Sequence, residues 1–268
     1  YQGWTPESGW KVNVSRVKGA LDDIASNVEK TAPSRSLSVN PSRPTQERSE
    51  GEANNSRLSG SLFGLGHYAK SVILPNLPEE IGVSHIHEID PVQLGKKEEW
   101  DRTIDTSKHC RPSETPDIFF IAGYHHTHAS LAVKALEQES WAVVEKPLCT
   151  THEQLGKIKK LYKKKQRLFT GFHKRYSSLN EYISEDLGVK NGECINYYCI
   201  VYEIPLPDLH WYNWPNSKSR VVSNGCHWLD HFMYLNDYSP VKRNKVYQGD
   251  SGDMIVVVEL QNNALFSM

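Results

Sequence analysis

The sequence has few cysteines, no long apolar run and almost no net charge. Its five cysteines are an odd number and include no C-x-x-C pair, which predicts free thiols in a reducing compartment. No apolar stretch approaches the roughly 20 residues of a membrane span, and the N-terminus lacks a secretory pattern. Lysine and arginine total 31 against 32 aspartates and glutamates, so no global field attracts nucleic acid or anionic lipid. We therefore expect a cytoplasmic protein that acts on a small molecule, with no nucleic acid and no membrane among its partners.

The 268 residues allow one large domain or two ordinary ones. Residues 31–60 hold three prolines, seven serines and only five apolar residues, too few to offset the entropy of ordering. Together with one predicted surface helix at residues 17–28, this composition predicts that residues 1–56 form an N-terminal extension and polar linker. The first residue is Tyr1 rather than methionine, so we expect an artificial or cleavage boundary there.

Strands alternate with helices after residue 57. An apolar burst at residues 61–63 is followed by strand-like runs at 83–89, 117–123, 141–144 and 168–172. Helical patterns follow the burst up to about residue 77 and recur at 129–137 and 151–165. This alternation predicts βαβ units and a parallel sheet, hence an α/β protein with a Rossmann-type domain at residues 57–172.

The pattern changes beyond Arg175. Two β-rich runs, 194–203 and 254–260, are separated by loop and by one helix at about 225–235. We predict an α+β substrate domain at residues 173–268 with an open, largely antiparallel sheet. The domain ends soon after a strand, so we expect it to be incomplete. The uncovered edge of its sheet would then need further strands or a partner subunit. We expect a homo-oligomer formed through this C-terminal sheet.

A G-x-G-x-x-A motif lies at the first strand-to-helix junction. Gly64 permits the tight turn, Gly66 lets a pyrophosphate approach the backbone, and Ala69 lets the helix pack close to the sheet. The helix N-terminus supplies free N–H groups to phosphates. Glu88 follows Gly66 by 22 residues, the spacing that places a carboxylate on the adenosine ribose, and Asp90 is the alternative. A carboxylate there would repel a 2′-phosphate, so NAD is expected and NADP is less favoured; both acids could instead only cap the strand end.

Two further segments carry a resemblance to a family. The run from Pro116 to Ala129 contains a His-rich turn, H-H-T-H, and is followed by an E-K-P motif at residues 145–147 and a G-x-H-x-x-D motif at 225–230. In this order, together with the glycine motif, they resemble the Gfo/Idh/MocA oxidoreductases over residues 58–235. The resemblance implies a nicotinamide-binding Rossmann domain joined to a sheet domain. It also implies oxidation or reduction of sugars, cyclitols or their nucleotide-linked forms.

The resemblance assigns two catalytic residues. Lys146 of E-K-P would stabilise negative charge on the substrate oxygen as hydride leaves the carbon. His227 would take the hydroxyl proton, a role that suits an ordinary imidazole better than lysine. Many relatives place an aspartate four residues before this histidine, whereas this chain has Ser223. Another carboxylate such as Asp230 would then have to substitute, or the chemistry is weakened.

The remaining expected contacts fall into two sets. The resemblance implies cofactor contacts at the glycine loop, the second strand end, the His-rich turn and E-K-P: Gly64, Gly66, His67, Tyr68, Ala69, Glu88, Gly123, His125, His126, His128, Glu145 and Lys146. Substrate contacts are expected from basic, aromatic and polar side chains further on: Arg175 (or Lys174), Trp211, Trp214, Arg220, Ser223 and Asp230. The basic pair could equally end a solvated strand, and the aromatic loop could be a lid or an oligomer contact.

Two other interpretations are rejected. The histidines at 125, 126, 128 and 227 with Cys226 match no zinc spacing, so we predict no metal. Six lysines between residues 157 and 165 spread around the polar side of a helix, which indicates a solvated face. The function predicted is NAD(P)-dependent hydride transfer at a hydroxyl-bearing carbon. The alternatives are a sugar lyase or hydrolase that uses NAD without net redox change, and a non-catalytic sensing module.

Overall fold

A computed structural model describes residues 57–94, 103–107, 114–190, 192–250 and 252–268. Contacts divide the chain into two units, Tyr1–Ala53 and Asn54–Met268, and all described residues belong to the second. The predicted extension, linker and surface helix within residues 1–56 lie outside the described residues.

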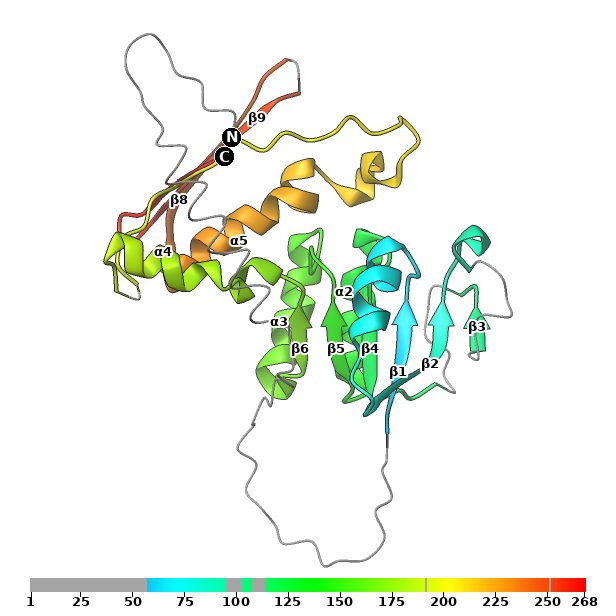
Figure 1. Cartoon of the computed structure of the whole chain (residues 1–268). Coiled ribbons are helices and arrows are strands. Elements are labelled where there is room, and N and C mark those ends of the chain that lie inside the picture. Colours follow the sequence, from blue (N-terminus) through cyan, green and yellow to red (C-terminus); the bar gives the residue numbers. More distant parts are fainter. Residues whose placement is uncertain (1–56, 95–102, 108–113, 191, 251) are drawn as a thin grey trace, which may run out of the picture. The chain divides into compact units, whose positions relative to one another are not determined.

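The first half of the described chain is built on a parallel sheet of six strands (Figure 1). The strands are β1 (Leu58–Phe63), β2 (Ile81–His87), β3 (Thr103–Asp105), β4 (Ile118–Ile121), β5 (Trp141–Val144) and β6 (Leu168–Thr170). Their order is β3-β2-β1-β4-β5-β6. The chain adds β2 and β3 on one side of β1, then returns to the other side of β1 to add β4, β5 and β6. This is the dinucleotide-binding order, with a crevice at the carboxyl ends of β1 and β4. The predicted α/β, Rossmann-type fold is confirmed.

Burial on both faces explains the continuous apolar strands. All four residues of β4 are buried: Phe119 and Ile121 pack with α2 (His125–Glu137), and Ile118 and Phe120 pack on the opposite face. That opposite face is covered by the short helical turns η1 (Ala69–Ile73) and η2 (Leu74–Asn76). Strands enclosed in this way read as apolar runs rather than as alternating patterns.

Helix α3 (His152–Lys165) begins where the sequence predicts, with Thr151 as its N-cap. Thr151 and Gln154 form a capping box, which satisfies backbone donors at the helix start. Ile158 is the one fully buried residue of this helix, and its lysines are exposed or half-buried. The lysine-rich face is thus solvated, as predicted.

A mixed sheet of four strands forms the second half, in the order β7-β10-β9-β8. Its strands are β7 (Tyr197–Tyr198), β8 (Val241–Gln248), β9 (Met254–Leu260) and β10 (Leu265–Ser267), antiparallel except for the β7–β10 pair. Helix α5 (Cys226–Leu235) buries Phe232 against Val258 and Phe266 on one face. Helix α4 (Leu179–Leu187) and the turns η5 (His173–Tyr176) and η8 (Val221–Gly225) connect these elements.

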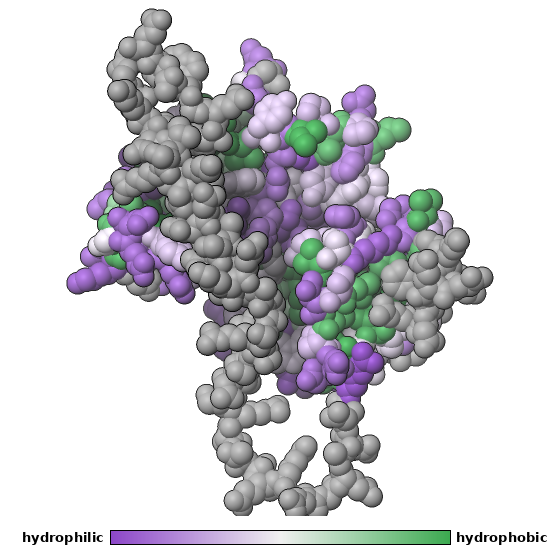
Figure 2. Space-filling view, viewed as in Figure 1, coloured by the Kyte–Doolittle hydropathy of each residue, from purple (hydrophilic) through white to green (hydrophobic). Residues whose placement is uncertain are grey.

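Three elements differ from the prediction. The strand expected at 194–203 is limited to β7, because the residues after Tyr198 have no neighbouring strand within the described chain. Apolar side chains of this segment, drawn yellow in Figure 1, are exposed, and Ile200 is fully so. Figure 2 shows green apolar patches among hydrophilic surface at this end of the molecule. Strand β8 has no apolar pattern because all eight of its residues are exposed, and backbone pairing with β9 holds it. The helix expected near residue 225 starts earlier, as the π-helical turn η8.

Candidate active site

A pocket of about 370 Å³ lies at the carboxyl ends of β1, β2 and β4. The glycine loop, the end of β2 and the turn after β4 form its walls, and two tryptophans come from the second half of the chain. The lining residues include Gly64, Gly66, His87, Glu88, Asp90, Gly123, Tyr124, His126, Thr127, Trp211 and Trp214. The pocket therefore occupies the crevice where an open α/β sheet binds its ligand.

The two glycines of the motif have different roles. Gly64 has φ +95°, and a Cβ there would lie 2.4 Å from Cα of Gly123, so no other residue fits without backbone movement. A Cβ on Gly66 would meet no atom within 4 Å. The space beside Gly66 is thus open to a ligand and would be filled by a side chain. This geometry fits the close approach of a pyrophosphate.

Glu88 holds the glycine loop in place. Its Oε2 accepts a hydrogen bond from the Leu65 N–H at 2.6 Å, and its Oε1 accepts one from the Asp90 N–H at 2.8 Å. The carboxylate is buried but lines the pocket together with Asp90. No lysine or arginine is among the lining residues that the structure describes. The pocket end near β2 is therefore acidic.

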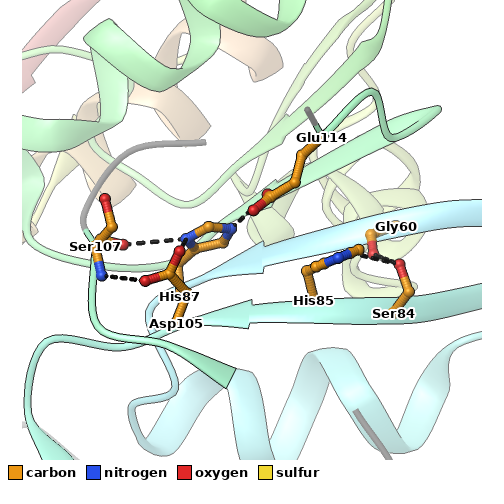
Figure 3. A network of polar contacts seen from close by, with 7 residues as sticks. All are labelled: Gly60, Ser84, His85, His87, Asp105, Ser107 and Glu114. Carbon is orange, nitrogen blue, oxygen red and sulfur yellow. Dashed lines mark hydrogen bonds and ion pairs between the residues drawn. The ribbon is translucent and has the colours of Figure 1, made fainter. Parts of the chain in front are cut away.

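His87, which lines the pocket, is the centre of a buried polar cluster (Figure 3). Its Nε2 faces Oε2 of Glu114 at 2.8 Å, while its Nδ1 faces the Ser107 carbonyl at 3.1 Å and Asp105 at 3.9 Å. The ligand atoms of His87, Asp105 and Glu114 lie within 4.8 Å of one another. The two carboxylates, however, face different ring nitrogens, and a metal ion binds only one imidazole nitrogen. This arrangement supports a hydrogen-bonded cluster rather than a metal site.

The His-rich turn starts α2, and its three histidines have different surroundings. His126 lines the pocket. His128 is fully buried behind it, with Nδ1 2.8 Å from the Pro147 carbonyl and Nε2 3.0 Å from the Gly123 carbonyl. Burial lowers the pKa of His128, although these carbonyl contacts oppose the shift. His128 thus links the pocket turn to the E-K-P turn.

His125 lies under the aromatic loop. Its ring is 4.6 Å from that of Trp211 and 5.0 Å from that of Tyr212, centroid to centroid. Burial, with the charges of His128 and Lys146, lowers the pKa of His125 to about 3, so the ring is neutral at pH 7. Trp211 and Trp214 also contact Tyr124, at 5.2 and 5.1 Å between ring centroids. The structure thus places both tryptophans, expected at the substrate, against the pocket at the glycine loop.

Lys146 and Glu145 follow β5, where the sequence places E-K-P. The Lys146 ammonium donates a hydrogen bond to the Ser223 carbonyl at 3.0 Å. Burial raises the pKa of Glu145 to about 7, opposed by Lys146 and by a hydrogen bond from Tyr68. Glu145 therefore holds a proton over much of the neutral range, and Lys146 is held by the second half of the chain.

His227 lies at the start of α5 beside η5. Its ring is 4.8 Å from that of His173, and its Nδ1 has no hydrogen-bond partner among the described residues. Burial lowers the pKa of His227 to about 3, and Lys146, His173 and Lys174 add to this effect. Ser223 is fully buried, and its hydroxyl reaches only the Arg220 carbonyl at 3.5 Å. His227, which the resemblance assigns as the catalytic base, is therefore neutral, and position 223 provides no carboxylate beside it.

The other expected substrate contacts pair with each other or with nearby acids. Arg175 donates two hydrogen bonds to Asp230, one of them from Nε to Oδ2 at 2.8 Å. Arg220 forms an ion pair with Glu203, and its guanidinium lies 4.8 Å from the Tyr212 ring centroid. The Arg175–Asp230 pair connects η5 to α5, and both residues are occupied within the protein.

Sequence comparison adds to this geometry. Residues 75–173 match an oxidoreductase family with an NAD-binding Rossmann fold, Gfo/Idh/MocA. By this match, the first half of the described chain is similar to the Gfo/Idh/MocA Rossmann domain. The resemblance read from the motifs is confirmed, and the expected cofactor, NAD, agrees with the NAD-binding description of this family.

The Gfo/Idh/MocA likeness extends to individual proteins. YteT of Bacillus subtilis, a proposed oxidoreductase, is 25% identical over 167 residues, which cover 59% of this chain and 36% of YteT. The WlbA dehydrogenase of Bordetella pertussis, solved with NADH and UDP-GlcNAcA, has a TM-score of 0.64 at 15% identity, covering 79% of this chain and 69% of its own. Myo-inositol 2-dehydrogenase of Lactobacillus plantarum has a TM-score of 0.61 at 16% identity, covering 78% and 68%. The chain spans about a third of YteT, and the solved structures show the shared fold.

Sequence reasoning missed several residues of this site. Tyr124 and Tyr212 are packed into it by the aromatic loop, and Thr127 lines the pocket. His173 was not singled out, although it directly precedes the basic pair and contacts His227. Its place in a short turn after β6 is the one signal that could have identified it. The described residues also contain no helix that is long and apolar enough to cross a membrane.

Proposed function

We propose that this protein is an NAD-dependent oxidoreductase that transfers hydride between the nicotinamide and a hydroxyl-bearing carbon of a sugar, cyclitol or nucleotide sugar. The observation that carries this proposal is the pocket at the carboxyl ends of β1, β2 and β4, with open space at Gly66. Residues 57–172 would form the cofactor domain and residues 173–268 the substrate and oligomerisation domain.

NAD fits the residues present. The glycine loop would hold the pyrophosphate, since Gly66 leaves room there for phosphate oxygens. Asp90 and Glu88 would bind the adenosine ribose, with Glu88 also fixing the loop through the Leu65 N–H. Two carboxylates would repel the extra phosphate of NADP, and no cation lines the described pocket to compensate. The bound cofactor would supply the hydride acceptor.

Lys146 and His227 would act on the substrate hydroxyl. The Lys146 ammonium would stabilise the oxygen as it gains negative charge, and it would exchange its bond to the Ser223 carbonyl for one to the substrate. His227 is neutral, so a ring lone pair is free to accept the hydroxyl proton. Glu145 and Tyr68 share a hydrogen bond beside Lys146 and would position it.

The substrate class rests on two supports. The solved structures of similar fold include a dehydrogenase in complex with UDP-GlcNAcA and a dehydrogenase named for myo-inositol, and both compounds are rich in hydroxyl groups. The aromatic faces of Trp211 and Tyr212 close to the site are suited to packing on rings. If the wild-type protein binds NAD but turns over no hydroxylated substrate, the sensing role would be favoured instead.

We further propose that the protein is a cytoplasmic homo-oligomer. The four described cysteines are free thiols, which supports a reducing compartment. At the end of β7 and in the segment that follows it, Tyr198, Ile200, Tyr202 and Ile204 expose between 64% and 101% of their surface, which supports contact with a second copy there. Light scattering of the purified chain would test this, and a monomer at micromolar concentration would refute it.

Thermal unfolding with added cofactor tests the central proposal. At a concentration 100 times its Kd, a bound ligand stabilises by about 2.7 kcal/mol, or roughly 5–10 °C in Tm for a protein of this size. NAD should reach this shift at a lower concentration than NADP. Equal shifts would refute the role of Glu88 and Asp90, and no shift with either cofactor would refute the cofactor assignment.

A further inference from the structure

Two ammonium groups flank His227 without a carboxylate partner. Lys146 bonds only to the Ser223 carbonyl, and Lys174 has no ion pair with any acid that the structure describes. Acids nearby are occupied: Asp230 pairs with Arg175, Glu203 pairs with Arg220, and Glu145 shares a hydrogen bond with Tyr68. The surroundings of His227 therefore carry uncompensated positive charge.

Of the two neighbouring basic residues in η5, Lys174 rather than Arg175 is available to bind an anion. The Arg175 guanidinium makes both of its contacts with Asp230. The Lys174 ammonium instead lies 5.2 Å from the ring centroid of Trp228. This contact involves no acceptor oxygen, so it leaves the three N–H donors of Lys174 available for hydrogen bonds. Trp228 directly follows His227, and His173 directly precedes Lys174, with the two imidazoles 4.8 Å apart. Lys174 is thus placed next to the histidine that would move the proton.

His227 itself lacks a partner on this side. The residue is nine-tenths buried, and its Nδ1 makes no hydrogen bond with any described residue. A buried polar nitrogen without a partner is costly unless a ligand or water completes it. Ser223, four residues before His227, supplies no charge to the ring, and its hydroxyl reaches only the Arg220 carbonyl at 3.5 Å.

We propose that Lys174 is the anion-binding residue of the substrate site and that the substrate carries a carboxylate or a phosphate. This rests on the proposed function, since it names the substrate class of that site. The substrate anion would lie beside Lys174 and Trp228, and its charge would stabilise protonated His227. A neutral sugar would leave the Lys174 ammonium and the His227 ring uncompensated.

Binding of three matched probes tests this without requiring turnover. D-glucose, D-glucuronate and D-glucose 6-phosphate are titrated into the full chain by calorimetry at constant ionic strength, with and without saturating NADH. We expect at least one anion to bind 10-fold or more tightly than glucose, and the two anionic arms separate a carboxylate from a phosphate site. Equal binding of all three probes, or no binding of either anion, would overturn the proposal.

Variants locate the effect. Lys174→Met should remove the anion preference by at least 10-fold, Lys174→Arg should retain it, and Lys164→Met, at an exposed lysine of α3, should leave it unchanged. A His227 resonance followed by NMR should titrate at higher pH when the anion binds wild-type protein, and not in Lys174→Met. An unchanged preference in Lys174→Met refutes the assignment. NADH binding is measured on the wild-type protein and on every variant. If wild type does not bind NADH, the proposed function is refuted, and the anion preference is then judged from the binding of the three probes alone.

Discussion

Replacing each glycine of the loop by alanine should separate folding from cofactor binding. At Gly64 the φ of +95° strains any other residue, and the new Cβ would lie 2.4 Å from Cα and 2.5 Å from N of Gly123, both backbone atoms that cannot rotate away. Backbone strain of this kind costs about 1–3 kcal/mol, and the forced shift of the turn adds a similar amount. Gly64→Ala should therefore lose at least about 2 kcal/mol, which lowers Tm by at least about 4 °C.

Gly66→Ala should behave in the opposite way. The new methyl group meets no protein atom within 4 Å, and φ is not in the left-handed region, so stability should change by less than about 1 kcal/mol. The same methyl group would occupy the space of the pyrophosphate, and NADH affinity should fall at least tenfold, a loss of about 1.4 kcal/mol.

Urea unfolding and NADH fluorescence titration on both variants make the comparison. The reasoning fails if Gly64→Ala is as stable as Gly66→Ala, or if Gly66→Ala binds NADH as tightly as wild type. Each variant serves as the control for the other, because both replace a glycine by alanine within the same loop.

Two further predictions concern the E-K-P turn. Lys146→Met should abolish turnover, while NADH affinity should change less than about threefold because Lys146 bonds to the Ser223 carbonyl and not to the glycine loop. Steady-state kinetics measures the turnover, and fluorescence titration measures the NADH affinity. Surviving turnover would contradict the role given to the ammonium. Burial raises the pKa of Glu145 from 4.5 to about 7, so the native state binds this proton more tightly than the unfolded chain does. The free energy of unfolding should therefore decline from pH 4.5 to pH 7 and then level off. Glu145→Gln should lack this decline, worth at most about 3 kcal/mol, in urea unfolding across that range, and parallel curves for variant and wild type would show that the carboxyl is not perturbed.

Local patterns were enough to predict the Rossmann half. The apolar run at β4 is buried on both faces, the helix α3 starts at a capping threonine, and Gly64 takes the positive φ that its motif implies. In each case the signal depends on residues close in sequence. The family match, over residues 75–173, lies within the same half and begins after the glycine loop.

Features that depend on distant partners could not be predicted. Glu88 was expected to bind ribose, but its bond to the Leu65 N–H depends on how the loop folds over β2. Arg175 was expected at the substrate, yet it pairs with Asp230, 55 positions away. The run at 194–203 alternates like a strand, and only its neighbours decide whether it pairs; β8 shows the reverse, pairing fully without any apolar pattern.

The position of His128 between two carbonyl oxygens has a consequence for how the site responds. A neutral imidazole carries a single N–H, so the ring can donate to the Pro147 carbonyl or to the Gly123 carbonyl but not to both at once. Movement of one proton from Nδ1 to Nε2 would transfer a hydrogen bond from the turn that presents Lys146 to the turn that lines the nucleotide pocket, with no side chain changing its rotamer. Tautomer exchange at this one buried ring would therefore couple the turn that presents Lys146 to the turn that lines the pocket.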